Sequence, residues 1–283
     1  MRDPGAPFWV PSPALQAHLN RAASGDPGID WLTHVRSRHL PSRIARTLVV
    51  GCGEGHVERA LARMPGVGDI LAVDTDAGAV ERARRRSGVL AGTRVAHAVW
   101  NPGAEPPPEG PFDAVVVQGF LHHAANPGAV LRGLRSVLSP RGRLAFFDYV
   151  GPNRFAYDEA TLAIARRYAR LLPQRLVGDP QKWRTALPDS AELSRSRPTE
   201  AARSEEILGL ARRVFREEAV RGAGGALLHP LLAGRESGFG ADRDGDERVL
   251  SVLCAAERKL VADQSLRDPF ALFVGRPRES AAG

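Results

Sequence analysis

Residues 48–61, LVVGCGEGHVERAL, place a short apolar run directly before three glycines at alternate positions, Gly51, Gly53 and Gly55, and a helical pattern directly after them. A strand that enters a glycine-rich loop and leaves as a helix is a frequent ligand-binding arrangement, because glycine allows backbone conformations and close approaches that other residues do not. The stretch therefore predicts an α/β fold with a ligand at this loop. A tight turn without a ligand is the alternative interpretation.

The spacing of these glycines excludes two common phosphate-binding loops. A dinucleotide-binding fingerprint reads G-x-G-x-x-G, and its third glycine would stand where the chain has His56. A loop of the form G-x-x-x-x-G-K-[ST] would begin its lysine-containing end at Val57. Glycines at alternate positions instead let the backbone pass close to a small, zwitterionic amino-acid group.

An acidic residue in the next predicted strand completes the pattern. Asp74 lies in the stretch AVDTD, 23 residues after Gly51, and a carboxylate there can accept hydrogen bonds from both hydroxyls of a ribose. Its alternative role is to cap the following helix, as aspartate often does. Together the loop and the carboxylate indicate a nucleoside ligand without a diphosphate, which is S-adenosylmethionine (SAM).

Short β-branched runs alternate with helical patterns along residues 46–147, and this rhythm predicts a doubly wound parallel sheet with right-handed crossovers. The strands expected there span 47–50, 69–73, 93–99, 113–118 and 142–147, and the helices span 56–64, 77–86 and 127–138. After Tyr149 the rhythm breaks, and later patterns predict helices over 158–172, 205–212 and 247–260 and strands over 214–221 and 270–275.

At this point the chain resembles the class I SAM-dependent methyltransferases. The stretches VVGCGEG, VDTD, FDAVVVQGFLHH and LSPRGRLAFFDY follow one another in that family's order. Four further stretches resemble a bacterial subgroup that acts on small molecules and natural products: SGDPGIDWL, YVGPNRF, EAARSEEI and GGALLHPLL. The resemblance covers most of residues 20–276.

The fold that the resemblance implies is a Rossmann-like, seven-stranded mixed sheet whose last strand is antiparallel. The expected organisation is an N-terminal helical segment over 1–45 and a SAM-binding core over 46–150. A helical lid over 151–204 is inserted after the fifth strand, and residues 205–283 complete the core with the last two strands. The lid has too few apolar residues for a core of its own.

Nine residues are the predicted cofactor site of a protein that binds SAM and releases S-adenosylhomocysteine. They are Gly51, Cys52, Gly53, Gly55, Asp74, Thr75, Trp100, Asn101 and Gln118. The chain departs from the family at Val49 and Val99, where many members carry an acid. Trp100 and Asn101 follow Val99, so adenine is expected to be held by stacking and by a side-chain amide.

Three residues are candidates for the chemistry of methyl transfer. His122 and His123 follow the fourth strand, where a histidine can take a proton from a hydroxyl or an amine as the methyl group moves. Asp148, at the end of the fifth strand, is a further candidate. The alternative is structural: the histidines start the next helix and pack against the loop, and Asp148 acts as a cap or positions Tyr149.

The predicted acceptor site consists of residues from the lid and its surroundings, namely Tyr149, Arg154, Phe155, Tyr157 and His229. Aromatic residues at such spacing can equally form the core of a lid, and a histidine such as His229 can be a packed structural residue. No metal ligand is predicted, because the chain has no acidic cluster like that of the magnesium-dependent catechol-type enzymes.

Composition argues against a nucleic-acid substrate in spite of a formal charge of +7. Of the 39 basic residues 37 are arginines, scattered among 32 acidic residues, which is typical of high-G+C coding bias and not of a phosphate-binding stripe. Cys52 and Cys254 have no pairing or zinc spacing, which indicates a reducing compartment. Neither a secretion signal nor a bilayer-spanning run is visible, so a cytoplasmic location without a membrane partner is expected.

The sequence therefore predicts a metal-independent methyltransferase that acts on a small molecule, at oxygen, in specialised or glycan metabolism. Motifs of adenine-N6, cytosine-N4 and cytosine-C5 methyltransferases are missing. Two alternatives stay open: a protein of the same fold that catalyses a cyclisation or rearrangement or serves as a scaffold, and an RNA methyltransferase. The oligomeric state is also open, with a homodimer as one option.

Overall fold

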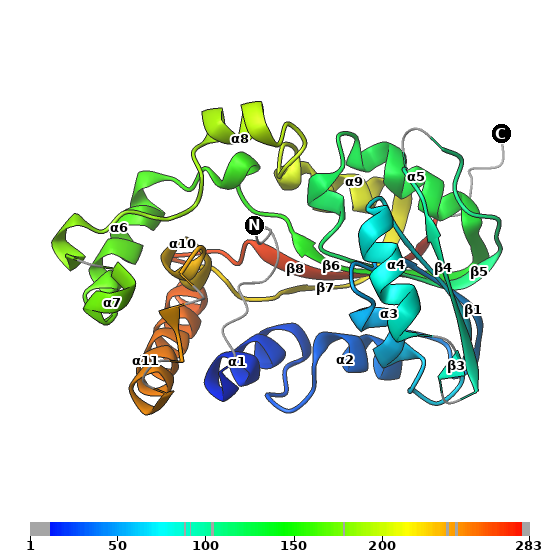
Figure 1. Cartoon of the computed structure of the whole chain (residues 1–283), viewed down its shortest axis with the longest axis horizontal. Coiled ribbons are helices and arrows are strands. Elements are labelled where there is room, and N and C mark those ends of the chain that lie inside the picture. The colour runs from blue at the N-terminus through cyan, green and yellow to red at the C-terminus, as the bar shows by residue number, and fades with distance from the viewer. Residues whose placement is uncertain are drawn as a thin grey trace.

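A twisted sheet runs through the protein and carries helices on both faces (Figure 1). The computed structural model describes residues 12–278 apart from positions 88, 91, 103, 104, 178, 236, 237, 241 and 242. The outer ends of the predicted segments 1–45 and 205–283, at 1–11 and 279–283, therefore lie outside the described residues.

Within the described residues eight strands pair in the order β3-β4-β2-β1-β5-β6-β8-β7. They are β1 Ile44–Val50, β2 Val67–Asp74, β3 Val89–Leu90, β4 Thr93–Val99, β5 Phe112–Gln118, β6 Leu138–Tyr149, β7 Phe215–Gly222 and β8 Phe270–Pro277. Pairing is parallel from β4 to β6, and β8 runs antiparallel to β6 and to β7. The predicted seven-stranded mixed sheet is confirmed, and the two-residue β3 adds an antiparallel edge beside β4.

Eleven α-helices and four 3-10 turns connect these strands in the described part of the chain. The helices before the lid are α1 Pro13–Ser24, α2 Trp31–Arg38, α3 His56–Leu61, α4 Ala77–Arg86 and α5 Pro127–Val137. The later ones are α6 Glu159–Ala169, α7 Gln174–Val177, α8 Ser190–Ser196, α9 Ile207–Val214, α10 Leu228–Leu232 and α11 Arg243–Ala262. The turns are η1 Leu121–His123, η2 Asn153–Phe155, η3 Pro180–Lys182 and η4 Ser204–Glu206.

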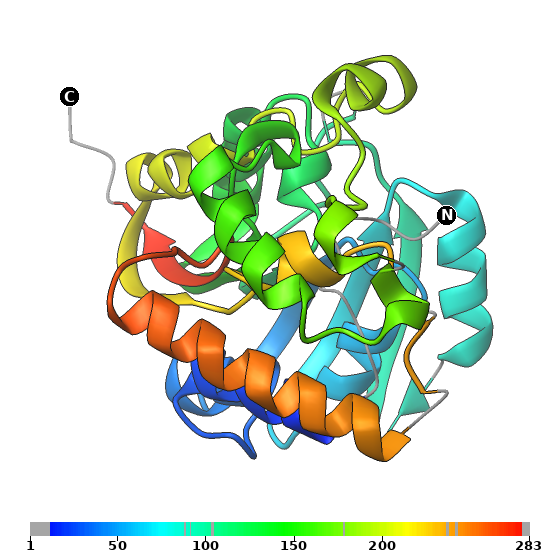
Figure 2. The same cartoon turned by 90° about the vertical axis from the view of Figure 1, so that its left-hand side faces the viewer.

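Both faces of the central strands are buried, which explains their nearly continuous apolar sequences. On β5, Val115 and Val117 pack with α5 and α9, whereas Ala114 and Val116 pack with α2, α3 and α4. A third apolar cluster joins α1, α6, α10 and α11 beyond the ends of β6 and β8. Figure 2 shows this side, with the orange α11 crossing the front and the green α6 above it.

Predicted and observed boundaries differ mainly where tertiary pairing sets the ends of an element. The helix predicted over 56–64 ends at Leu61, because the chain turns there to enter β2. The strand predicted over 142–147 is longer, since Leu138 pairs with β5 and Tyr149 pairs with β8. Helix 77–86 and strand 93–99 have the predicted ends.

The parallel strands bring four loops to one edge of the sheet, because the carboxyl ends of β1, β2, β4 and β5 point the same way. These loops contain the glycines after β1, the acid at the end of β2, the polar residues after β4 and the histidines after β5. The fold thus gathers the predicted cofactor and catalytic segments at one place.

Candidate active site

The glycine loop requires left-handed backbone at all three glycines, with φ of +76° at Gly51, +51° at Gly53 and +85° at Gly55. A Cβ on Gly51 would lie 2.8 Å from Phe120 Cβ and 3.0 Å from the carbonyl oxygen of Gln118, so the loop after β5 packs directly against this position. At Gly53, by contrast, no described atom lies within 4 Å of where a Cβ would stand. Gly53 therefore faces open space.

Asp74 ties the glycine loop to the turn after β2. Its Oδ2 accepts the backbone N–H of Gly53 at 2.8 Å, and its Oδ1 accepts that of Asp76 at 3.0 Å. The N-cap of α4 is Asp76, whose carboxylate accepts from the backbone N–H of Gly78. Asp74 therefore does not cap α4, and the alternative interpretation of this residue is wrong.

A cavity of about 830 Å³ opens between these loops. It is lined by Gly51, Gly53, Asp74, Thr75, Asn101, Pro102, Gly119, Phe120, His123, Ala124, Ala125 and Thr199. Five of the nine predicted cofactor residues are in this lining, and they come from the loops after β1, β2 and β4. The volume is that of a typical small-molecule site.

Four of the predicted cofactor residues, Cys52, Gly55, Trp100 and Gln118, lie behind this lining. Trp100 is only 5% exposed, packs in the core beside α5, and donates its indole N–H to the carbonyl oxygen of Pro106. Its ring is thus turned away from the predicted stacking role. Burial raises the pKa of the Cys52 thiol to about 12, with Glu58 and Asp74 adding to the effect, so this cysteine is a packed, unreactive residue.

Asp148 organises the turn that follows β5. Its carboxylate accepts the backbone N–H groups of Phe120, Leu121, His122 and Tyr149. It also lies 2.6 Å from Nδ1 of His122. Both Asp148 and His122 are 1% exposed, so they support η1 from behind, while His123 faces the cavity.

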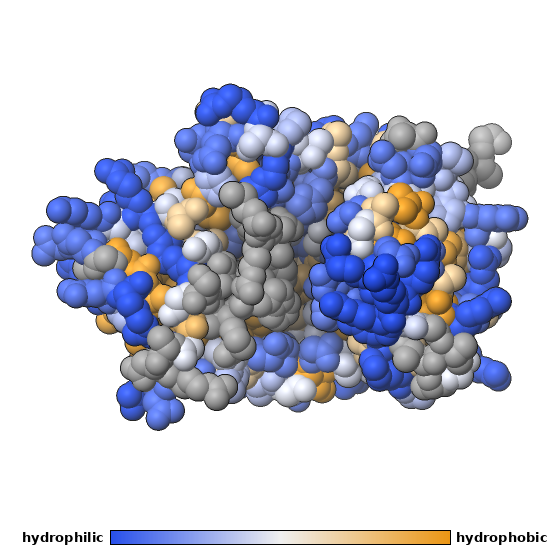
Figure 3. Space-filling model, viewed as in Figure 1, coloured by the Kyte–Doolittle hydropathy of each residue, from blue (hydrophilic) through white to orange (hydrophobic). Residues whose placement is uncertain are grey.

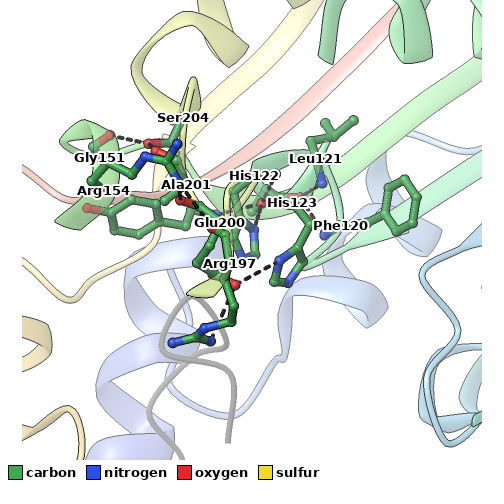
Figure 4. A network of polar contacts seen from close by, with 12 residues as sticks. Phe120, Leu121, His122, His123, Gly151, Arg154, Arg197, Glu200, Ala201 and Ser204 are labelled. Atoms are coloured by element: carbon green, nitrogen blue, oxygen red, sulfur yellow. Dashed lines mark hydrogen bonds and ion pairs between the residues drawn. The ribbon is translucent and has the colours of Figure 1, made fainter. Parts of the chain in front are cut away.

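Glu200 reaches this turn from the segment 151–204, and it is not among the site residues predicted from the sequence. Its Oε2 lies 3.1 Å from Nδ1 of His123, and its Oε1 lies 3.7 Å from Nε2 of His122. Glu200 is 3% exposed, and Arg197 approaches the same carboxylate at 3.4 Å (Figure 4). The backbone N–H of the next residue, Ala201, donates to the carbonyl oxygen of His122.

Arg154, predicted to bind the acceptor, instead holds the segment that carries Glu200. Its guanidinium donates to the carbonyl oxygens of Arg197, Pro198 and Glu200, and its backbone N–H donates to that of Ala201. Arg154 and Ala201 both have positive φ, of 59° and 45°. Such strain in non-glycine residues persists only where surrounding contacts fix it, and it often marks functional sites.

The other predicted acceptor residues form one aromatic cluster beside the cavity. Tyr149 packs against Phe155 and His229, and the Tyr157 hydroxyl lies 2.7 Å from Nδ1 of His229. Burial raises the pKa of Tyr157 well above its usual value. The structure brings these residues together, yet the cavity wall is formed by other residues.

The two departures from the family occupy different surroundings. Val49 is fully buried in the layer under α3, where it packs as a core residue. Val99 is 48% exposed at the end of β4, next to the Asn101 side of the cavity.

In the described residues no helix is both long and apolar enough to cross a membrane.

Comparison with known proteins shows similarity to methyltransferases. Residues 48–144 match a protein family described as a methyltransferase domain. Among curated proteins, the chain is 34% identical over 150 residues to the ubiquinone biosynthesis O-methyltransferase of Xanthomonas euvesicatoria pv. vesicatoria, an alignment that covers 50% of this chain and 60% of that protein. The chain thus matches less than two thirds of the length of this relative.

Solved structures share the fold at low sequence identity. A putative methyltransferase from Bacillus halodurans superposes with a TM-score of 0.52 and 16% identity, over 87% of this chain and 97% of that one. The [4+2]-cyclase SpnF superposes with a TM-score of 0.51 and 17% identity, over 88% and 81%. These similarities concern the fold alone.

Proposed function

Residues 48–144 match the methyltransferase domain family, and from this premise we propose that the protein transfers the methyl group of SAM to a hydroxyl oxygen of a small molecule. The whole chain has the class I SAM-dependent methyltransferase fold. The observation that carries the proposal is the joint lining of one cavity by Gly53, Asp74 and His123. A cofactor subsite and a polar acceptor-facing group are thus side by side.

The residues present fit the cofactor. Asp74 uses one lone pair of each oxygen on backbone N–H groups, which leaves each oxygen able to accept a ribose hydroxyl. Gly53 faces open space on the same wall, so the amino-acid end of the ligand can approach the backbone there. Asn101 and Thr75 supply further polar contacts. When bound, SAM supplies an activated methyl group on its sulfonium.

The protein's own task is alignment. It must hold the acceptor oxygen in line with the bond that breaks and exclude water, which accounts for several kcal/mol of a barrier of this kind. We assign the acceptor contact to His123, because it faces the cavity, and the positioning roles to His122 and Asp148, because both are buried behind it. Residues 151–204, as a lid, would cover the acceptor.

Oxygen as the methylated atom is supported by the names of the curated relatives, which are O-methyltransferases. The acceptor class that we propose is a small molecule of specialised or glycan metabolism, on the strength of the sequence stretches shared with the bacterial subgroup. The fold similarity to SpnF keeps a cyclisation or rearrangement as the second candidate.

Calorimetric titration with S-adenosylhomocysteine tests the cofactor site. The wild-type protein is expected to bind it with micromolar affinity, and Asp74→Ala is expected to lose about 1.5–3 kcal/mol of binding free energy, typical of hydrogen bonds to a charged group. The matched control is Asp69→Ala, toward the other end of β2, where the carboxylate pairs with exposed Arg94.

NADH serves as the ligand control and should not bind. Equal affinity of Asp74→Ala and wild-type protein would remove Asp74 from the site. If folded wild-type protein does not bind S-adenosylhomocysteine at all, methyl transfer is ruled out and the second candidate takes its place.

A further inference from the structure

His122, His123 and Glu200 present three metal-ligating atoms to one small space. One ring nitrogen from each histidine and one carboxylate oxygen all lie within 4.8 Å of one another. The separations of 3.1 Å between His123 Nδ1 and Glu200 Oε2, and 3.7 Å between His122 Nε2 and Glu200 Oε1, are those of two ligands on one ion. Bonds of about 2.0–2.2 Å to nitrogen and oxygen place neighbouring ligands roughly 3–4 Å apart.

The second nitrogen of His122 is held as it is in many metal sites. Its Nδ1 lies 2.6 Å from Asp148, a carboxylate that also accepts four backbone N–H groups. Asp148 therefore acts as an acceptor, and Nδ1 carries the hydrogen. This leaves the lone pair of a neutral His122 on Nε2, directed toward Glu200, and a carboxylate behind the ring is the usual support of a metal-ligating histidine.

Glu200 needs a positive partner on the side that faces His122. The residue is 3% exposed, and its Oε1 has no hydrogen-bond partner in the described part of the chain. A buried carboxylate oxygen opposite an imidazole lone pair is unfavourable unless a proton or a metal cation stands between them. Arg197 reaches only the other oxygen, Oε2, at 3.4 Å.

We propose that His122 Nε2, His123 Nδ1 and Glu200 bind one divalent transition-metal ion, of the zinc class, at the edge of the cavity. Two imidazoles and one carboxylate suit ions such as Zn²⁺, Mn²⁺ or Co²⁺, whereas Mg²⁺ prefers oxygen ligands and water. This proposal differs from the sequence-based expectation of a metal-independent protein. Because His123 lines the cavity, the remaining coordination positions face it.

Where methyl transfer is the reaction, which is the proposed function, the ion has a specific use. An acceptor hydroxyl that binds it has a lowered pKa and is held in place before it receives the methyl group. The three protein ligands would then be fixed by Asp148 from behind and by Arg154 through the backbone around Glu200.

Metal binding is measured on the full chain after removal of adventitious ions with a chelator. Titration with Zn²⁺ by calorimetry, and with Co²⁺ by its visible absorption, should give one equivalent per chain. Glu200→Gln and His123→Ala should each weaken binding at least about tenfold. His34→Ala is the control, because His34 and His39, at the C-terminal end of α2, form another close histidine pair that is not part of the proposed site.

No stoichiometric binding to the wild-type protein, or binding unchanged in both site variants, would overturn the site. Titration with S-adenosylhomocysteine in the same preparations separates this outcome from failure of the proposed function, since the cofactor residues are not metal ligands. Retained cofactor binding in Glu200→Gln also shows that the variant is folded. An ion bound by protein that does not bind the cofactor would support the metal site and contradict methyl transfer.

Discussion

Gly51 and Gly53 share a left-handed backbone but serve the loop in different ways. A side chain at Gly51 would collide with Phe120 and with the backbone of Gln118, so this glycine permits close packing of two loops. A side chain at Gly53 would enter the cavity instead. One glycine is thus required by the fold, and the other by the ligand.

Replacing each glycine by alanine should therefore affect different properties. Gly51→Ala should mainly lower stability, and Gly53→Ala should mainly lower ligand affinity. Both variants incur about 1 kcal/mol for the left-handed conformation. Gly51→Ala should lose a further 1–3 kcal/mol of unfolding free energy, roughly the range for an overpacked site, whereas Gly53→Ala should mainly lose affinity for S-adenosylhomocysteine. Denaturant unfolding and calorimetry measure the two quantities. Equal stability of the two variants would show that the Phe120 contact is readily relieved.

Some residues of the site could be predicted from the sequence, and others could not. Gly51, Gly53, Asp74 and His123 could be predicted to lie at one cavity because each stands at the carboxyl end of a strand or in the loop after it. Glu200 could not, since its contact with His123 depends on how the lid returns to the sheet. Its only signal in the sequence is that it opens the stretch EAARSEEI. The sequence predicts that Arg154 binds the acceptor, whereas in the structure Arg154 holds the segment that carries Glu200.

At the scale of elements, the strands were predictable because both of their faces are buried, and this leaves continuous apolar runs. Their ends were less so. The ends of β6 depend on pairing with β5 and β8, which no local pattern encodes. Likewise α10, the five-residue LHPLL, is too short for helical periodicity and is fixed by its contacts with α6 and α11.

The junction of α11 and β8 contains a buried carboxylate, Glu257, and a half-buried one, Asp268, whose pKa values shift in opposite directions. Glu257 accepts the backbone N–H groups of Gly225, Leu227 and Leu228 and lies 2.6 Å from His18. Burial alone would raise the pKa of Glu257, but His18 and these donors lower it overall. Asp268 has weaker support, and burial, followed by the nearby Glu257, raises its pKa to about 6.

Asp268 should consequently make stability depend on pH. A raised carboxyl pKa adds stability that is fully present below the unfolded value near 4 and is lost as pH rises through about 6. Asp268→Asn should therefore raise the unfolding free energy at pH 7.5 by up to about 3 kcal/mol, and change it little at pH 4. Denaturant unfolding at both pH values tests this.

Asp263→Asn is the control for this experiment. Asp263 lies in the same connection but caps an exposed turn through the backbone N–H of Ser265, and its pKa is lowered. Its replacement should reduce stability at neutral pH or leave it unchanged. A neutral-pH gain in both variants would point to net charge, not to burial of Asp268.

At the scale of the whole molecule, part of the excess of arginine is balanced by local pairing, and α4 shows this most clearly. The helix α4 carries four exposed arginines, which form much of the deep blue surface on the right of Figure 3. Arg82 and Arg86 pair with Glu54, and Arg84 and Arg85 pair with Glu81. A basic protein need not present a free cationic stripe when its charges are arranged in this way.

This arrangement predicts only weak, non-specific binding of RNA, which can be measured. Non-specific binding through phosphate contacts has a dissociation constant of about 10⁻⁴–10⁻⁶ M at physiological salt and weakens steeply as salt rises. The wild-type protein should bind a short single-stranded RNA no more tightly than this. The double variant Glu54→Gln, Glu81→Gln removes a glutamate partner from each of four arginines and should bind more tightly, with a steeper salt dependence. Nanomolar, salt-resistant binding by the wild-type protein would contradict a small-molecule acceptor. Such binding requires a surface specific for nucleic acid, and the paired arginines of α4 do not provide one.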